Sequence, residues 1–336
     1  MAHKIGKRTM RLEHPPAVAG FASVVSQKEG EGPLKEYFDE IETDSLFGQK
    51  SWEQAESVIQ KRAANRALKN AGMTPADMDA VFAGDLLNQC IGSTFGLRDL
   101  EIPFVGLYGA CSTMAESLCV GSVFLDSGAA ANCLCLTSSH FCSSERQFRF
   151  PLEYASLRTP TSQWTVTGGG AVVLSGTGSG IRVREVTVGK IIDPNITDAN
   201  NMGAAMAPAA ADTVSAFLAD TGTSPDDYDG IFTGDLGRVG GELFCQLMEE
   251  QGISLRNVYR DCGVMMFPPD MKDVYAGGSG CGCSASVLCS FLLKEMQNGR
   301  FKNILFAATG ALLSPTSSMQ GESIPGISHL VHLSAD

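Results

Sequence analysis

The sequence MTPADMDAVFAGDLL at residues 73–87 occurs a second time, with few changes, as TSPDDYDGIFTGDLG at residues 223–237. Each copy begins with a proline turn, continues into a short apolar stretch and then reaches the tripeptide Gly-Asp-Leu. A turn followed by a short buried strand and a helix-forming stretch is typical of one unit of an α/β protein. The chain therefore contains the same unit twice.

A second pair of segments extends the repeat. Residues 109–139 and 280–310 both run from a Gly/Cys turn through a helical stretch and a Gly-ended loop to a nearly continuous apolar strand. Upstream, a predicted helix at residues 51–70, with Ser51 as its N-cap, is answered by the apolar-periodic residues 207–222. Strands this apolar are typical of a parallel sheet covered by helices on both faces.

We predict an α/β protein built by internal duplication of one βαβαβαββ unit. The first half covers residues 1–180 and the second half residues 181–336, because the last strand of one half and the first strand of the next meet there. Residues 17–25 are predicted as the first strand and residues 329–334 as the closing strand. The basic residues 1–14 lack an apolar stretch behind them, so we expect a frayed polar tail.

Composition limits the classes of function. The formal net charge of −12 argues against a nucleic-acid partner, because such proteins usually carry a basic face. The eleven cysteines are an odd number and several lie in apolar runs, which indicates free thiols and no disulfide framework. Their spacing is wrong for metal ligands, so we expect neither a metal nor a cofactor. No apolar run reaches the roughly 18 residues of a membrane-spanning helix.

The main chemical feature is Cys111, which lies on a Gly-Ala turn just before an amphipathic stretch. A thiol at a helix N-terminus meets unpaired backbone N–H groups and the positive end of the helix dipole. Both effects lower a cysteine pKa and favour a nucleophile or an anion site. The alternative is a buried thiol kept for packing, but the turn lies where the two halves converge, which favours a pocket position.

A duplicated α/β unit whose first half opens its third helix with a cysteine resembles the thiolase superfamily, from about residue 15 onward. The motif GACS at residues 109–112 matches the nucleophile of that family at Cys111, and GGGAVVL at residues 168–174 matches the glycine-rich strand of ketoacyl synthase III-like members. The resemblance implies a five-layer αβαβα fold. It also implies an acyl-accepting cysteine served by two residues from loops of the second half.

The partners that this resemblance implies are missing. In synthase III-like members a histidine follows the second strand of the second half, where this chain has Gly-Asp-Leu at residues 234–236. Cys281 stands where an asparagine would be, and Ala-Thr-Gly at residues 308–310 stands where thiolases carry a second catalytic cysteine. Because Asp235 repeats Asp85 of the first half, we expect it to end a strand and cap the next helix.

Within the superfamily, residues 145–172 and 326–334 resemble a branch associated with sporulation. That branch is linked to moving dipicolinic acid, which is pyridine-2,6-dicarboxylate, into the developing spore together with membrane proteins of the same operon. The resemblance implies a protein of the sporulating cytoplasm that lies peripherally at the spore inner membrane and matters for spore germination. It implies dipicolinic acid, alone or as its calcium chelate, as the ligand.

Candidate ligand-binding residues are the polar groups at strand ends and helix starts that this resemblance places near the pocket. For the histidines the alternative is a core or loop role, for the arginines a solvated surface position, and for the GGSGCG loop at residues 277–282 a tight turn in place of an anion cradle. The candidates are Cys111, Ser139, His140, Arg146, Arg149, Gly280, Cys281, Cys283, Thr309 and His329.

Three hypotheses about function remain open. The first is a non-catalytic binder of dipicolinic acid, with Cys111 as a vestigial nucleophile position. The second is an acyltransferase or condensing enzyme that uses Cys111 with helpers such as His140 or His329. The third is a scaffold of a membrane complex without a small ligand. Thiolase relatives also dimerise through an edge strand, for which residues 102–106 are the candidate.

Overall fold

The computed structural model describes residues 2–148, 158–255 and 257–336, and most of its strands form one large mixed sheet. The first-half strands follow the order β3, β9, β7, β5, β6, and the second-half strands follow the order β10, β15, β14, β11, β12. Corresponding strands take corresponding places, which confirms the predicted duplication. The bounds are β3 Ala17–Ser26, β5 Ala80–Gly84, β6 Phe104–Gly106, β7 Asn132–Ser139, β9 Gly168–Ser175, β10 Ile181–Thr187, β11 Gly230–Thr233, β12 Tyr259–Asp261, β14 Asn303–Ala311 and β15 Gly326–Ala335.

The pairing directions repeat as well. Strand β5 is parallel to both β6 and β7, whereas β9 is antiparallel to β7 and β3. In the second half β11 is parallel to β12 and β14, whereas β15 is antiparallel to β14 and β10. The two halves join where Arg182 of β10 pairs with Ala17 of β3. The position of the boundary at residue 180 stays a prediction.

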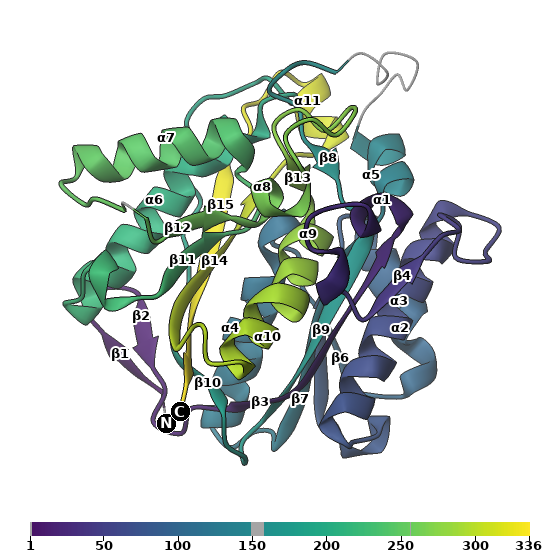
Figure 1. Ribbon diagram of the computed structural model, residues 1–336, viewed down its shortest axis with the longest axis vertical. Helices are drawn as coiled ribbons and strands as arrows, with labels where there is room; N and C mark the ends of the chain where they lie inside the picture. Colours follow the sequence, from purple (N-terminus) through teal and green to yellow (C-terminus); the bar gives the residue numbers. More distant parts are fainter. Residues whose placement is uncertain (1, 149–157, 256) are drawn as a thin grey trace.

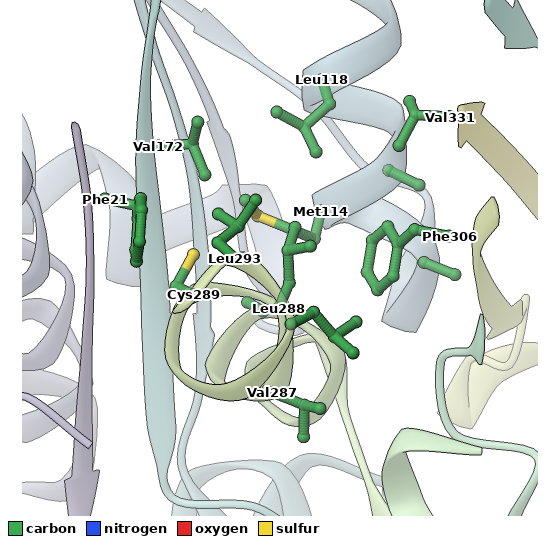
Figure 2. Close-up of a cluster of buried hydrophobic side chains, with 14 of the residues drawn as sticks. Phe21, Met114, Leu118, Val172, Val287, Leu288, Cys289, Leu293, Phe306 and Val331 are labelled. Atoms are coloured by element: carbon green, nitrogen blue, oxygen red, sulfur yellow. The ribbon is translucent and has the colours of Figure 1, made fainter. Parts of the chain in front are cut away.

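Two helices fill the space between the halves of the sheet (Figure 1). One is α4 (Thr113–Asp126), and the other runs from α9 (Cys281–Val287) through a π-helical segment (Leu288–Leu292) into α10 (Leu293–Gln297). Figure 2 shows their apolar side chains meeting those of strands from both halves, and the residues labelled there are Phe21, Met114, Leu118, Val172, Val287, Leu288, Cys289, Leu293, Phe306 and Val331. One core therefore joins the two halves.

Other helices cover the outer faces. In the first half these are α2 (Trp52–Ala71) and α3 (Ile91–Leu97), and in the second half α6 (Met202–Thr221) and α7 (Gly237–Glu250). Their apolar stripes form separate clusters with the sheet. The layers are therefore helix, sheet, helix, sheet, helix, which is the αβαβα order predicted. The remaining elements are α1 Gln27–Gly30, α5 Phe141–Phe148, α8 Cys262–Met266, α11 Pro315–Met319, β1 His3–Ile5, β2 Thr9–Arg11, β4 Glu40–Glu42, β8 Trp164–Thr165 and β13 Gly278–Ser279.

The two long outer helices, α2 and α6, are capped in the same way at both termini. Ser51 and Asn201 accept hydrogen bonds from the first turns of α2 and α6, and both helices stop at a left-handed glycine, Gly72 or Gly222. By length and composition alone α6 could cross a membrane, although most of it is buried against the sheet. An apolar helix buried in this way is a core helix of the fold.

The N-terminal residues are not the frayed tail that the sequence suggested. They form a hairpin of β1 and β2, and β2 pairs with β10 of the second half. The carboxylate of Asp220 at the end of α6 accepts backbone N–H groups from Lys7, Arg8 and Thr9 at 2.7, 2.9 and 3.0 Å. The prediction was wrong because the anchoring carboxylate lies more than 200 residues away in the chain.

The predicted dimer edge at residues 102–106 contains β6, which lies at one end of the sheet. The residues Phe104 and Val105 are 41% and 40% exposed. An apolar edge strand with free backbone groups can pair with another strand. Pairing of two copies of this chain along β6 stays a prediction.

Replacing Asp220 by Ala is expected to loosen the N-terminal hairpin, because three backbone donors lose their acceptor. We expect a loss of about 1–3 kcal/mol in unfolding free energy, measured by urea denaturation.

The same anchor depends on pH. Burial raises the pKa of Asp220, but the hydrogen bonds from Lys7, Arg8 and Thr9 lower it by more, and the resulting pKa is about 2. The anchor should therefore be intact above about pH 4 and weaken as the pH falls toward 2. Asp226→Ala, at an exposed position, is the control, and equal effects of the two variants would contradict the anchor.

Candidate functional site

Cys111 lies on a tight turn that is pressed against the end of β14. The turn is a single 3-10 turn, Ala110–Ser112, and Ala110 takes a left-handed backbone conformation with a φ of 49°. A Cβ atom added to Gly310 would lie 2.3 Å from the carbonyl oxygen of Gly109 and 3.2 Å from the nitrogen of Cys111. Glycine at position 310 therefore lets the two backbones touch, and this contact fixes where the thiol lies.

A second thiol, that of Cys281, packs in the same cluster as the thiol of Cys111. Cys111 and Cys281 are both buried and form one small cluster with Leu86 and Phe148. Cys281 opens α9, and its thiol donates to the carbonyl oxygen of Ser138 at 2.9 Å. All eleven cysteines carry free thiols, and no group of His, Cys, Asp or Glu within the described parts of the chain is arranged to hold a metal ion. The starts of the two central helices thus converge in one small cluster of buried, mostly apolar side chains.

The third member of the site is Asp235, which follows β11 and is fully buried. Its carboxylate accepts hydrogen bonds from the backbone nitrogen of Gly280 at 2.9 Å, from Oγ1 of Thr309 at 2.8 Å and from Oγ of Ser279 at 3.2 Å. Burial raises the pKa of Asp235 to about 6, although hydrogen bonds from Gly280 and from the thiol of Cys111 act in the opposite direction. A carboxyl group therefore faces Cys111.

The duplication misled the interpretation of this residue. Asp85, its counterpart, turns toward its own half and accepts from the hydroxyl and the nitrogen of Ser93 at 2.6 and 2.7 Å and from the nitrogen of Leu87 at 2.9 Å. Asp235 turns instead toward α9 and Cys111. The expectation that Asp235 caps the next helix was wrong, because another carboxylate takes that role.

That carboxylate belongs to Asp261 at the end of β12. It accepts from the nitrogens of Leu236 and Gly237, both at 2.9 Å, and from the hydroxyl of Thr233 at 2.7 Å. Burial raises the pKa of Asp261 to about 7, and the neighbouring charge of Asp235 raises it as well. Asp261 thus holds the start of α7, which leaves Asp235 free to face the site.

The thiol of Cys111 has a raised pKa, whereas an activated nucleophile has a lowered one. Burial raises its pKa well above the ordinary value, and the nearby charge of Asp235 raises it further. A helix terminus contributes only about 0.3–1 kcal/mol, which is less than one pKa unit, whereas full burial can shift a pKa by about 3–5 units. Burial therefore wins, and the lowered pKa expected from the helix start was wrong.

The glycine-rich loop before α9 uses its donors inside the protein. The nitrogen of Gly280 donates to Asp235, the nitrogen of Gly282 donates to Oγ of Ser139 at 3.1 Å, and the nitrogen of Cys283 donates to the carbonyl of Gly280 at 2.9 Å. The structure therefore supports the tight turn for these residues and not the anion cradle.

The predicted residues Ser139 and His140 have structural contacts. Ser139 donates to the carbonyl of Val166 at 2.7 Å while it holds the start of α9. His140 bonds through Nε2 to the carbonyl of Ser45 at 2.8 Å and accepts at Nδ1 from the nitrogen of Cys142 at 3.1 Å. Both ring nitrogens are used, and burial lowers the pKa of His140, so it does not serve Cys111 as a base.

Arg146 and His329 have partners outside the cluster of Cys111, and for His329 this is the nitrogen of Gly189, which donates to Nδ1 at 3.3 Å. Arg146 pairs with Glu53 and lies over the ring of Trp52, while Arg149 lies outside the described residues. His329 lies on β15 opposite Ala308, and burial lowers its pKa to about 4. It is neutral at physiological pH.

Of the other candidates, Thr309 and Gly280 contact Asp235, and the thiol of buried Cys283 lies 3.9 Å from the carbonyl of Gly234. The structure thus brings together Cys111, Gly280, Cys281 and Thr309. Which residues contact a ligand stays a prediction.

Comparison with known proteins identifies the family. The family model described as "Stage V sporulation protein AD (SpoVAD)" matches residues 6–334. The chain belongs to the SpoVAD family. The stage V sporulation protein AD of Bacillus subtilis (strain 168) is 44% identical over 324 residues, which is 96% of each chain. This SpoVAD-family protein is therefore a sporulation protein.

Solved structures show the thiolase-like fold for the SpoVAD-family chain. The 3-oxoacyl-[acyl-carrier-protein] synthase III of Aquifex aeolicus VF5 superimposes with a TM-score of 0.57 at 12% identity, over 95% of this chain and 99% of that one. Cerulenin-bound OleA of Xanthomonas campestris gives a TM-score of 0.62 at 15% identity, over 96% and 97%. At such low identity these likenesses establish the fold alone.

Sequence reasoning found Cys111 and Cys281 but missed Asp235, Asp261 and Phe148. The signal for Asp235 was present, because it lies at the end of β11, next to where synthase III-like members carry a histidine. The internal repeat concealed it, because an equal residue in an equal place suggested an equal role. Nothing in the sequence pointed to Phe148 of α5 as a cover for the two thiols.

Replacing Asp235 by Asn is expected to make Cys111 more reactive, because the negative charge beside the thiol is removed. A fall of up to about one pKa unit would speed alkylation by iodoacetamide at about pH 8 by about three- to tenfold. Peptide mass spectrometry would measure the rate at Cys111 separately from the other cysteines. Asp85→Asn, at the matching position of the first half, should leave that rate unchanged. Equal rates in wild type and Asp235→Asn would contradict the electrostatic explanation.

Proposed function

We propose that this SpoVAD-family protein is a non-catalytic thiolase-fold protein that binds dipicolinic acid for its uptake into the developing spore. One observation supports the proposal that the protein is not a catalyst. Cys111 faces the carboxyl group of Asp235, next to where related enzymes place a histidine base, and the thiol stays protonated. The ligand is inferred from membership of the sporulation family and from the resemblance of residues 145–172 and 326–334.

Energetics support the loss of catalysis. A condensing or acyl-transfer reaction needs a thiolate, and a base must accept the proton of the thiol. Asp235 has a pKa of about 6, whereas burial and the nearby charge of Asp235 raise the pKa of Cys111 well above its ordinary value. Transfer of the proton from Cys111 to Asp235 is therefore uphill, and its cost adds to the barrier of the reaction.

The proposal extends to the place of action. We infer that the protein works on the cytoplasmic side of the spore inner membrane as a peripheral protein, together with membrane proteins of the same operon. Family membership supports this part. The apolar edge strand β6 supports a homodimer as the assembled form.

Isothermal titration calorimetry of the purified protein with dipicolinic acid, free and as its calcium chelate, tests the binding. Benzene-1,3-dicarboxylate, which has the same two carboxylates but lacks the ring nitrogen, is the control ligand. We expect saturable binding of dipicolinic acid. Absence of binding in both forms would contradict the proposed function.

Two further outcomes separate the competing functions. Incubation with acyl-coenzyme A followed by mass spectrometry would reveal a thioester on Cys111, and an adduct that turns over would establish an acyltransferase. Spores that carry Cys111→Ala and keep full dipicolinic acid content would favour a scaffold. Our proposal expects no adduct and a reduced content.

Replacing Gly310 by Ala should weaken ligand binding, because the added methyl group meets the carbonyl oxygen of Gly109 and displaces the turn that holds Cys111. We expect a dissociation constant at least about tenfold higher, since misplacing a packed turn costs roughly 1–3 kcal/mol. Gly176→Ala is the matched control, because its nearest new neighbour lies at 3.6 Å, an ordinary contact. Equal affinities in the two variants, both folded by circular dichroism, would place the ligand away from Cys111.

A further inference from the structure

The buried carboxyl group of Asp235 lies where the proposed function places an anionic ligand. A dicarboxylate bound beside Cys111 would bring a negative charge close to a buried carboxyl group. Like charges that share a buried site cannot both be ionised without a large cost. Either a cation or a proton has to relieve this repulsion.

The described arginines near this end of the molecule already have partners, which for Arg238 is the carbonyl oxygen of Tyr275. Arg146 forms an ion pair with Glu53, and Arg158 lies 3.0 Å from Glu145, with both side chains of the second pair almost fully buried. The hydrogen bonds to Asp235 come instead from neutral groups, namely Gly280, Ser279 and Thr309. A proton on Asp235 is therefore the simplest way to relieve the repulsion.

The hydrogen-bond partners of Asp235 can accommodate such a proton. Two of them are hydroxyl groups, on Ser279 and Thr309, and a hydroxyl group can turn from donor to acceptor when the carboxylate becomes a carboxylic acid. Only one partner, the nitrogen of Gly280, is fixed as a donor.

The neighbouring acid Asp261 differs in this respect. It accepts from three backbone nitrogens, those of Leu236, Gly237 and Val264, which can only donate, and from one hydroxyl group, that of Thr233. The pKa of Asp261, at about 7, is the higher of the two, but its carboxylate faces the start of α7, so a ligand beside Cys111 acts most directly on Asp235. The other titratable groups that interact with Asp235 are thiols with raised pKa values, which stay neutral, namely Cys111, Cys262, Cys281 and Cys283.

We propose that Asp235 is a specificity-determining residue that takes up one proton from solvent when the dicarboxylate binds, and then donates that proton in a hydrogen bond to a carboxylate of the ligand. No covalent bond other than the new O–H forms, and none breaks. This inference rests on the proposed function and adds the protonation state of its site. A carboxylic acid that donates to a carboxylate selects an anion, whereas an ionised Asp235 would repel it.

The expected pH dependence has a definite sign. The free protein holds Asp235 with a pKa of about 6, and the bound anion raises that pKa, so the complex carries more protons than its parts. The carboxyl groups of dipicolinic acid are themselves ionised above about pH 5. Affinity should therefore be highest near pH 5 to 6 and fall by up to about tenfold for each pH unit above 6.

The experiment is calorimetry of the full chain with dipicolinic acid from about pH 5.5 to about pH 8, in two buffers of different ionisation enthalpy. For wild type we expect the enthalpy to depend on the buffer, with uptake approaching one proton at about pH 7.5. Asp235→Asn keeps the shape, cannot ionise and should bind with an affinity independent of pH. Asp85→Asn, the matching position outside the site, should retain the dependence of wild type.

The outcomes separate this inference from the function on which it rests. Binding by wild type that takes up no proton and has the same affinity at every pH would overturn the role of Asp235 and leave the function standing. An unchanged pH dependence in Asp235→Asn would also overturn it. No binding by any protein at any pH would overturn the proposed function itself. The proton count on wild type does not depend on the folding of a variant, so absence of proton uptake overturns the role of Asp235 even if Asp235→Asn fails to fold.

Discussion

The contact between α9 and the glycine-rich strand β9 is the constraint on which the site depends. A Cβ atom on Gly170 would lie 2.3 Å from the carbonyl oxygen of Ala285, and one on Gly282 would lie 2.2 Å from that of Gly168. Helix and strand therefore touch backbone to backbone, which only glycine allows. This close approach carries Cys281 to the end of β7. The contact of Gly310 with the turn of Cys111 does the same for the other thiol.

Burial, more than any single charge, determines the protonation states of the groups around Cys111 and Asp235. Thiols and carboxyl groups sit among apolar side chains, and the neutral form of each is favoured because water is excluded. A histidine in such a site could share the proton of a thiol, whereas the carboxyl group of Asp235 raises the pKa of Cys111. The thiolase-like fold is thus kept while burial holds the thiol in its protonated form. That arrangement suits recognition of a ligand better than reaction with it.

The two halves share a fold but not a function. Asp85 and Asp235 occupy equal places after β5 and β11, yet one supports α3 and the other faces the site, because Asp261 supports the start of α7. One additional acid in the second half was enough to free Asp235. Duplication therefore preserves the layers of the fold, and small differences in hydrogen bonding decide where chemistry occurs.

The sequence by itself determined the duplication, the N-cap of α2 and the place of Cys111 and Cys281 at two helix starts, because these depend on local periodicity and on repeated motifs. Only the tertiary structure decided the direction of Asp235, the buried contacts of His140 and His329, the hairpin at the N-terminus and the raised pKa of Cys111. Each of these depends on groups far apart in the chain and on the exclusion of water, and neither is encoded in any one stretch of residues.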